Sequence, residues 1–187
     1  GVNQLVVPKI NVKAPVIWDS SFDEKIMLQN LQKGVVHYGG TDLPNSTTGN
    51  VFITGHSSYY WWDPGKYKTV FAVLDQVKNG DQVALTYQNQ VYVYQVYESI
   101  VVKPSQVEVL NTSAKPILSL MTCVPVGTSL NRLIVRANLV GVFGQAAAGA
   151  VSPTGEPTIE TPTPQPAATG PSQSLDSLPG FDSWIGQ

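Results

Sequence analysis

The amino-acid sequence predicts a mostly β protein, whose seven or eight short strands and two small helices close or nearly close into a β-barrel. Short apolar, β-branched runs recur along the chain and are separated by turn residues such as Asn79-Gly80-Asp81. Residues 91–96 alternate between two sets of side chains with the period of two that is typical of a strand. The chain has 187 residues, 42% of them hydrophobic, so it is long enough to fill the inside of a barrel.

The two expected helices lie among these strands. Residues 21–31 carry apolar side chains at helical spacing, and Asp23 and Glu24 stand in the first turn, where the helix dipole favours acidic residues. Residues 69–77 are expected to form a second short helix. The expected strands cover residues 5–8, 12–17, 51–53, 82–87, 91–102, 117–121 and 133–140.

The composition divides the chain into a body, residues 1–144, and a tail rich in Pro, Ala and Thr, residues 145–187. The tail holds seven prolines and no Lys or Arg, and its four acids give it a charge of −4 against +2 for the body. Such a segment is expected to be a solvated linker, because proline lacks the amide hydrogen that sheets and helices need. Its apolar end also allows it to dock on the body: Leu175, Leu178, Phe181, Trp184 and Ile185.

Charge and cysteine content exclude several classes of protein. Only 13% of the residues are charged and the net charge is −2, so no nucleic-acid partner is expected. No apolar run approaches the roughly 18 residues of a membrane span, and no signal peptide is evident, so we expect any membrane anchor to lie outside this sequence. A single cysteine excludes an internal disulfide framework and a zinc site with several cysteines.

Three residues are candidates for chemistry because each stands near the end of an expected strand. His56 follows the strand at 51–53, and Arg132 lies nine residues after Cys123, across a loop that can bring the two face to face. A thiol nucleophile, an imidazole that holds a proton and a guanidinium that stabilises an oxyanion together suit acyl transfer through a thioester. Taken singly, however, a lone Cys, His or Arg is more often structural, and the pattern alone leaves catalysis open.

Several motifs, in this order, resemble the sortase family, the cysteine transpeptidases of Gram-positive-type cell surfaces. Residues 5–16 resemble the family's opening strands, and residues 34–41 resemble its GxxHYxGT stretch. Residues 49–56 are similar to the strand that leads to its catalytic histidine. Residues 119–123, Ser-Leu-Met-Thr-Cys, resemble its TLxTC signature with Ser in the first Thr position, and residues 132–137 resemble the strand of its catalytic arginine.

The resemblance implies an eight-stranded sortase-type barrel with two or three short helices, in which residues 1–144 are the catalytic domain. It implies Cys123 as nucleophile, His56 as acid/base partner, Arg132 as stabiliser of substrate and oxyanion, and Thr122 as an oxyanion or substrate contact. Such an enzyme cuts an LPxTG-like sorting signal between Thr and Gly and passes the acyl group to an amine, either a peptidoglycan precursor or a pilin lysine. It needs no cofactor and works outside the cytoplasm, tethered to the membrane.

Rival residues and alternative functions remain at this point. His37 is expected to be structural or to line a wall, Arg136 to sit about 13 Å deeper along the strand than Arg132, and no metal is expected between the cysteine and the two histidines. The aromatic residues Tyr59, Trp61 and Trp62 either pack against the barrel or form a wall of the substrate groove. The alternatives to a transpeptidase are a sortase-like hydrolase and a catalytically silent surface scaffold.

Overall fold

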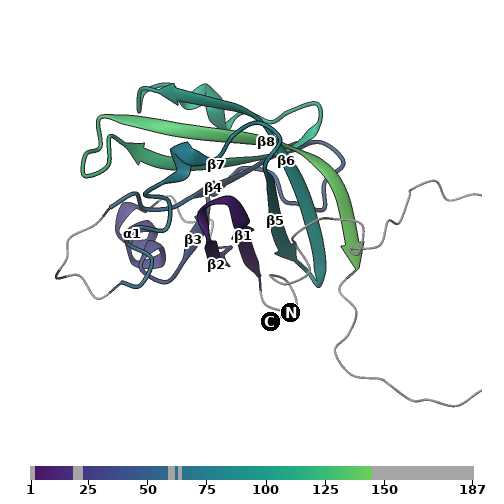
Figure 1. Cartoon of the computed structure of the whole chain (residues 1–187), viewed down its shortest axis with the longest axis horizontal. Helices are drawn as coiled ribbons and strands as arrows, with labels where there is room; N and C mark the ends of the chain where they lie inside the picture. Colours follow the sequence, from purple (N-terminus) through teal and green to yellow (C-terminus); the bar gives the residue numbers. More distant parts are fainter. Residues whose placement is uncertain (1–2, 19–22, 59–61, 63–64, 145–187) are drawn as a thin grey trace, which may run out of the picture.

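The computed structural model describes residues 3–18, 23–58, 62 and 65–144, and it is a closed barrel of eight strands (Figure 1). Around the barrel the strands follow the order β1–β2–β3–β4–β7–β8–β6–β5. The predicted mostly β, eight-stranded barrel is confirmed. The strands are β1 (Gln4–Val7), β2 (Val12–Ile17), β3 (Val35–His37), β4 (Gly49–Thr54), β5 (Gln82–Tyr87), β6 (Gln90–Val102), β7 (Pro116–Val124) and β8 (Asn131–Gly144).

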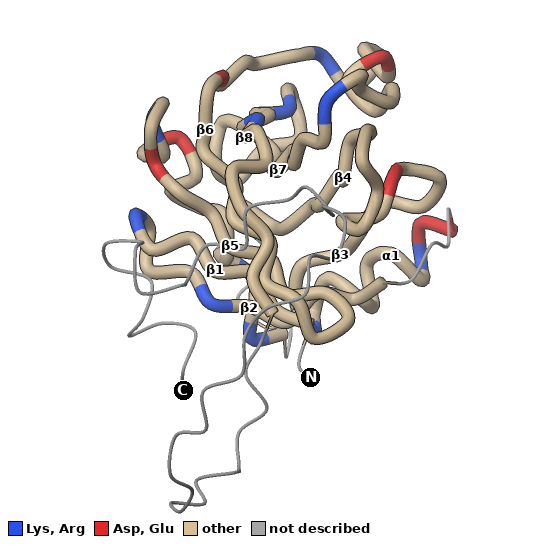
Figure 2. Tube along the Cα trace, turned by 90° about the vertical axis from the view of Figure 1, so that its right-hand side faces the viewer, with Lys and Arg blue, Asp and Glu red and all other residues tan. Residues whose placement is uncertain are grey.

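The strand pairing brings distant parts of the sequence together. β2–β3 and β4–β7 are parallel, and the other neighbours are antiparallel. Figures 1 and 2 show β4, β7, β8 and β6 on one side of the barrel and β1, β2, β3 and β5 on the other. The parallel pair β4–β7 joins segments more than sixty residues apart, with Thr54 level with Met121. This pairing, and that of β7 with β8, set the geometry of the candidate site.

Two apolar layers lie on opposite faces of the β4–β7–β8 sheet. Leu118 and Leu120 of β7 point into the barrel and belong to its main core, as do Val51 and Ile53 of β4. Alternate residues of the same strands face outward. There Phe52 and other side chains form a second buried cluster under the 3-10 turn η3 (Val107–Leu110), which lies in the connection between β6 and β7. The outer cluster comprises Phe52, Val102, Val109 and Ile134, with Tyr38, Ile100, Leu110 and Met121 packed against it.

The helices differ from the sequence prediction. The first, α1 (Glu24–Leu31), lies within the expected range and is capped by Asp23, whose Oδ1 accepts a hydrogen bond of 3.0 Å from the Ile26 amide. The helix predicted over 69–77 is wrong: the chain forms turns there, followed by the 3-10 turn η2 (Leu74–Gln76). Another 3-10 turn, η1 (Pro8–Ile10), follows β1. The described residues form one α-helix and three 3-10 turns, and a mostly β barrel with a few short helical segments agrees with the expected fold class.

The predicted turn at residues 88–90 is confirmed as a tight hairpin between β5 and β6. Tyr87 pairs with Gln90, so only two residues form the turn. Both have positive φ, 48° for Gln88 and 63° for Asn89, which is the backbone of a type I′ turn. That turn matches the right-handed twist of the two strands and fixes their register.

Candidate active site

Cys123 lies in β7, directly opposite Arg132 of β8. The two are Cα partners in the antiparallel β7–β8 pair, so the predicted juxtaposition of these residues is confirmed. Leu118 and Leu120 point into the barrel, and the alternation of side chains along β7 therefore turns Cys123 outward, on the face of Met121. The thiol is half-buried and is not part of a disulfide. It is thus within reach of a molecule lying on the outside of the sheet.

His56 reaches the same level from the other side of β7. Thr54 is level with Met121 in the parallel β4–β7 pair, and the Gly55 amide donates a hydrogen bond of 3.1 Å to the Met121 carbonyl. β4 ends at Thr54, and continuing its register past Gly55, which is still bonded to β7, places His56 beside the end of β7 that carries Cys123. The Phe71 amide holds the His56 carbonyl at 2.9 Å. The fold therefore brings all three predicted residues to one edge of the sheet.

Thr122 and Gly55 hold the backbone next to His56. The Thr122 hydroxyl is buried and donates a hydrogen bond of 2.9 Å to the Gly55 carbonyl. Gly55 must be a glycine, since a Cβ there would come within 2.6 Å of the Phe71 ring. The hydroxyl was predicted to contact the oxyanion or the substrate. In the structure this hydroxyl is bonded to Gly55, on the side of the strand opposite Cys123, and its contact with the oxyanion or the substrate stays a prediction.

The loop between β7 and β8 holds the Arg132 guanidinium. Arg132 Nη1 donates to the carbonyls of Ser129, at 3.0 Å, and Asn131, at 3.2 Å. The same loop is tied to the segment after His56, because the Gly127 amide donates to Ser58 Oγ at 2.9 Å. Sequence reasoning missed Ser58; its only signal was a hydroxyl two residues after the candidate histidine. These bonds connect the chain segments that carry the imidazole and the guanidinium.

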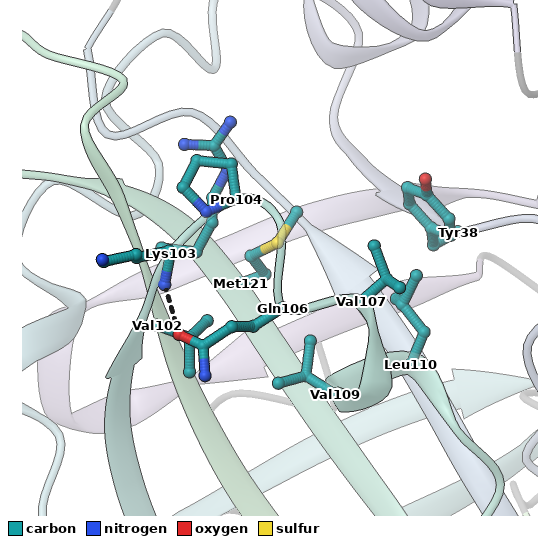
Figure 3. A pocket seen from close by; sticks show the side chains of 10 residues that line it. Tyr38, Val102, Lys103, Pro104, Gln106, Val107, Val109, Leu110 and Met121 are labelled. Atoms are coloured by element: carbon teal, nitrogen blue, oxygen red, sulfur yellow. Dashed lines mark hydrogen bonds between the residues drawn. The ribbon is translucent and has the colours of Figure 1, made fainter.

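An apolar cavity of about 210 Å³ opens beside Arg132 and Met121, which are among its lining (Figure 3), whereas Cys123 and His56 are not. Much of its wall comes from the β6–β7 connection, where Gln106 Oε1 accepts a hydrogen bond of 2.8 Å from the Lys103 amide. Sequence reasoning did not find this pocket, because its wall is a loop whose fold no local pattern reveals. The remaining lining residues are Tyr38, Val102, Pro104, Val107, Val109 and Leu110.

Residues 5–140 match the sortase domain family. The chain belongs to the sortase family. Among curated members, it is 27% identical over 135 residues to sortase D of Bacillus subtilis, covering 70% of this chain and 60% of that protein. It is 29% identical over 153 residues to a sortase A of Streptococcus agalactiae, covering 78% of this chain and 56% of that protein. The chain thus spans about 60% of the length of the curated sortases it matches.

Solved sortase structures share the fold. Sortase C-1 from Actinomyces oris superposes with a TM-score of 0.63 at 28% identity, covering 74% of this chain and 72% of that one. The pilus-related sortase C of Group B Streptococcus gives a TM-score of 0.64 at 29% identity, covering 74% and 66%. The family resemblance seen in the sequence motifs is therefore confirmed by both sequence and structure.

The rival basic residues of this sortase are engaged elsewhere. Arg136 lies opposite Ser119, four positions away from Arg132, and its Nη1 forms an ion pair of 3.0 Å with Glu98. His37 is buried, and its Nε2 donates a hydrogen bond of 3.0 Å to the Asp42 carbonyl. Burial lowers the pKa of His37 below its usual value, so the ring stays neutral at pH 7.

Other sequence-predicted features have separate outcomes. Trp62 is 64% exposed and is not among the residues that line the cavity beside Arg132, while Tyr59 and Trp61 lie outside the described residues. Over the described parts of the chain, no three His, Cys, Asp or Glu side chains come together in a way that could hold a metal. Figure 2 shows basic and acidic residues spread over several elements of the sortase barrel.

Proposed function

We propose that this sortase is a cysteine transpeptidase that cleaves an LPxTG-like sorting signal between Thr and Gly. The observation that carries the proposal is the direct cross-strand pair of Cys123 and Arg132, with His56 at the end of the adjoining strand. A nucleophile, a proton carrier and a permanent cation at one edge of a sheet are the groups that acyl transfer through a thioester requires. Cys123 and Arg132 stand on paired strands and His56 follows directly on β4 through Gly55, which limits the reorganisation needed during the reaction.

In the first half of the reaction, Cys123 Sγ attacks the carbonyl carbon of the signal's Thr as the thiolate, after its proton has passed to His56. The negative charge that develops on the carbonyl oxygen is stabilised by the Arg132 guanidinium. As the bond between carbon and nitrogen breaks, His56 gives its proton to the leaving amine of Gly. The products of this half-reaction are a thioester on Cys123 and a free peptide that begins with Gly.

In the second half, an acceptor amine attacks the carbonyl carbon of the thioester. His56 takes the proton that the amine loses, and Sγ leaves as the thiolate, which restores the starting state. A new amide bond replaces the thioester, so no external energy source is needed. The acceptor is a peptidoglycan precursor or a pilin lysine; the likeness to a pilus-related sortase C favours including a pilin-type lysine among the acceptors tested.

The apolar cavity supports the choice of signal. It opens beside Met121, two residues before the nucleophile, and its volume of about 210 Å³ suits one or two apolar side chains. The Leu and Pro of an LPxTG-like signal are the apolar residues that precede the cleaved bond by a short distance. A peptide anchored there by Leu and Pro would extend toward Cys123 with its Thr carbonyl.

Peptide cleavage with product analysis tests the proposal. A fluorescent LPxTG-type peptide is incubated with the protein, with and without an amine acceptor, and products are identified by mass spectrometry. We expect transfer to the amine, and we expect Cys123→Ala to abolish it. Hydrolysis alone, even with excess amine, would favour the hydrolase alternative. No turnover, together with a Cys123 that does not react with a thiol reagent, would favour the silent scaffold.

We also propose that the native protein works outside the cytoplasm, attached to the membrane. Among the described residues, none of the helices combines the length and the apolar character that crossing a bilayer requires. The hypothesis that residues 145–187 dock on the body concerns a segment outside the described residues, and it is tested below by truncation.

A further inference from the structure

A buried polar cluster joins β4 and β7 to η3, the 3-10 turn that forms part of the cavity wall. Asn50 of β4 and Ser119 of β7 are almost fully buried, with exposed fractions of 1% and 0%. The Ser119 hydroxyl donates a hydrogen bond of 2.7 Å to Asn50 Oδ1. Both residues lie on the strands that carry the candidate catalytic groups, but neither has a part in the reaction proposed above. Buried polar side chains are costly unless they are paired, so this cluster calls for an explanation.

The other end of the Asn50 side chain holds η3. Asn50 Nδ2 donates to the Val109 carbonyl at 3.0 Å and to the Asn111 carbonyl at 3.1 Å. Val109 and Leu110 line the cavity from above, and Met121 lines it from β7. The Asn50 side chain therefore ties η3, which forms part of the cavity wall, to β4, the strand that pairs with β7.

Ser119 determines which way the Asn50 carboxamide points. The Val109 and Asn111 carbonyls can only accept hydrogen bonds, so the amide must present its nitrogen to them. The Ser119 hydroxyl favours this orientation, because it donates to the oxygen at the opposite end of the amide. Without the Ser119 hydroxyl, Asn50 Oδ1 would be buried with no hydrogen-bond donor from Ser119. The amide orientation that lets Asn50 hold η3 would then be less stable.

We propose that Asn50, oriented by Ser119, is a positioning residue that fixes η3 over the sheet and so shapes the cavity for the apolar residues of the sorting signal. The proposal rests on the proposed function, because the cavity is taken as the site for that signal. Asn50 and Ser119 are expected to affect how tightly the peptide binds and which apolar peptide side chain the cavity prefers. The proposal assigns them no effect on the chemical step itself.

A comparison of Ser119→Thr with Ser119→Val tests the effect of the hydroxyl alone. Thr and Val have nearly the same shape, and the family signature has Thr at this position, so both are expected to fit. In a Cys123→Ala background that cannot cleave, binding of a labelled LPATG peptide is measured by fluorescence polarisation. We expect Ser119→Val to bind at least about five-fold more weakly than Ser119→Thr, since only Thr keeps the donor. Hydrogen exchange of residues 107–111 should be faster in the Val protein.

Kinetics in the cleaving protein separate positioning from general damage. Ser119→Val should raise KM while kcat changes little, and it should reduce the preference for LPATG over APATG, relative to Ser119→Thr. Tyr92→Phe is the matched control, because it removes another buried side chain's hydrogen bond, to Gln90 Oε1, away from the cavity. It should leave the Kd within about two-fold. If Ser119→Val does not fold, Ser119→Ala is compared with the parent instead.

The possible outcomes are distinguishable. Equal Kd values for Ser119→Thr and Ser119→Val would overturn this inference and leave the proposed function intact. A loss confined to kcat, with unchanged binding and selectivity, would overturn it as well. If the parent Cys123→Ala protein binds no LPATG peptide, the proposed function fails and this inference fails with it.

Discussion

Replacing Arg132 and Arg136 separately by alanine tests which of these two arginines on the same strand stabilises the oxyanion, the role that we propose for Arg132. Arg132 is the cross-strand partner of Cys123, whereas Arg136 lies opposite Ser119. Four residues of a β-strand span roughly 13 Å, so the two guanidinium groups start from very different distances to the thiol. Among the described residues, Arg132 donates hydrogen bonds to main-chain carbonyls of its own loop, and Arg136 is paired with Glu98.

The expected losses of activity in Arg132→Ala and Arg136→Ala differ by about two orders of magnitude. Removing one group that stabilises an oxyanion typically costs about 10²–10³-fold in kcat, which is about 2.7–4 kcal/mol, and we expect this loss for Arg132→Ala. The pair of Arg136 and Glu98 is partly exposed, with 23% and 38% of the side chains accessible, so breaking it should cost no more than about 1 kcal/mol of stability. Arg136→Ala should therefore keep activity within about three-fold.

The assay measures kcat/KM for cleavage of an LPxTG-type peptide and follows the thioester on Cys123 by mass spectrometry. Arg132→Lys is a useful intermediate, because it keeps the charge but loses the planar fork, and its rate should fall between those of the parent and Arg132→Ala. Thermal unfolding of each variant checks that the fold is retained. Near-parental activity for Arg132→Ala, with an inactive but folded Arg136→Ala, would refute the assignment.

Three further predictions concern the surroundings of the site. Thr122→Val leaves the Gly55 carbonyl without its hydroxyl donor and should lower the Tm by about 3–8 °C, with Thr122→Ser restoring most of the loss, as scanning calorimetry would show. Burial lowers the pKa of His37 in the folded protein below the value of about 6.5 expected in the unfolded chain. The contribution of the neutral ring to the free energy of unfolding is therefore complete above about pH 6.5 and is lost as the pH falls below that value. The Tm should therefore drop more steeply between pH 7 and 5 in the parent than in His37→Gln; identical slopes would contradict this. If the tail docks on the groove, a chain ending at Gly144 should cleave peptide faster, and equal rates would remove that hypothesis.

Local patterns in the sequence predicted many of the strands because each depends mainly on nearby residues. Alternation along 91–96 and the turn at residues 88–90 correspond to β6 and its hairpin. The prediction of a second helix over residues 69–77 was wrong for a physical reason. Phe71, Leu74 and Val77 are fully buried and recur every three residues, which suits turns and a 3-10 segment packed on the barrel as well as a helix. An apolar residue at every third position over so short a segment does not distinguish an α-helix from turns and a 3-10 segment.

The amino-acid sequence by itself determined the barrel, the family and the three candidate residues, because a sole cysteine and motifs in a specific order are properties of the chain alone. Tertiary structure decided which of two adjacent side chains lies on the outer face of the sheet, where we propose that the substrate binds. Cys123 points outward, while Thr122 points inward to Gly55, because strands present alternate residues to opposite faces and a shift of one residue in pairing would exchange them. That pairing joins β4 to β7 across more than sixty residues, and no local pattern specifies it. The bridge from Asn50 to η3 exists only once those strands have met.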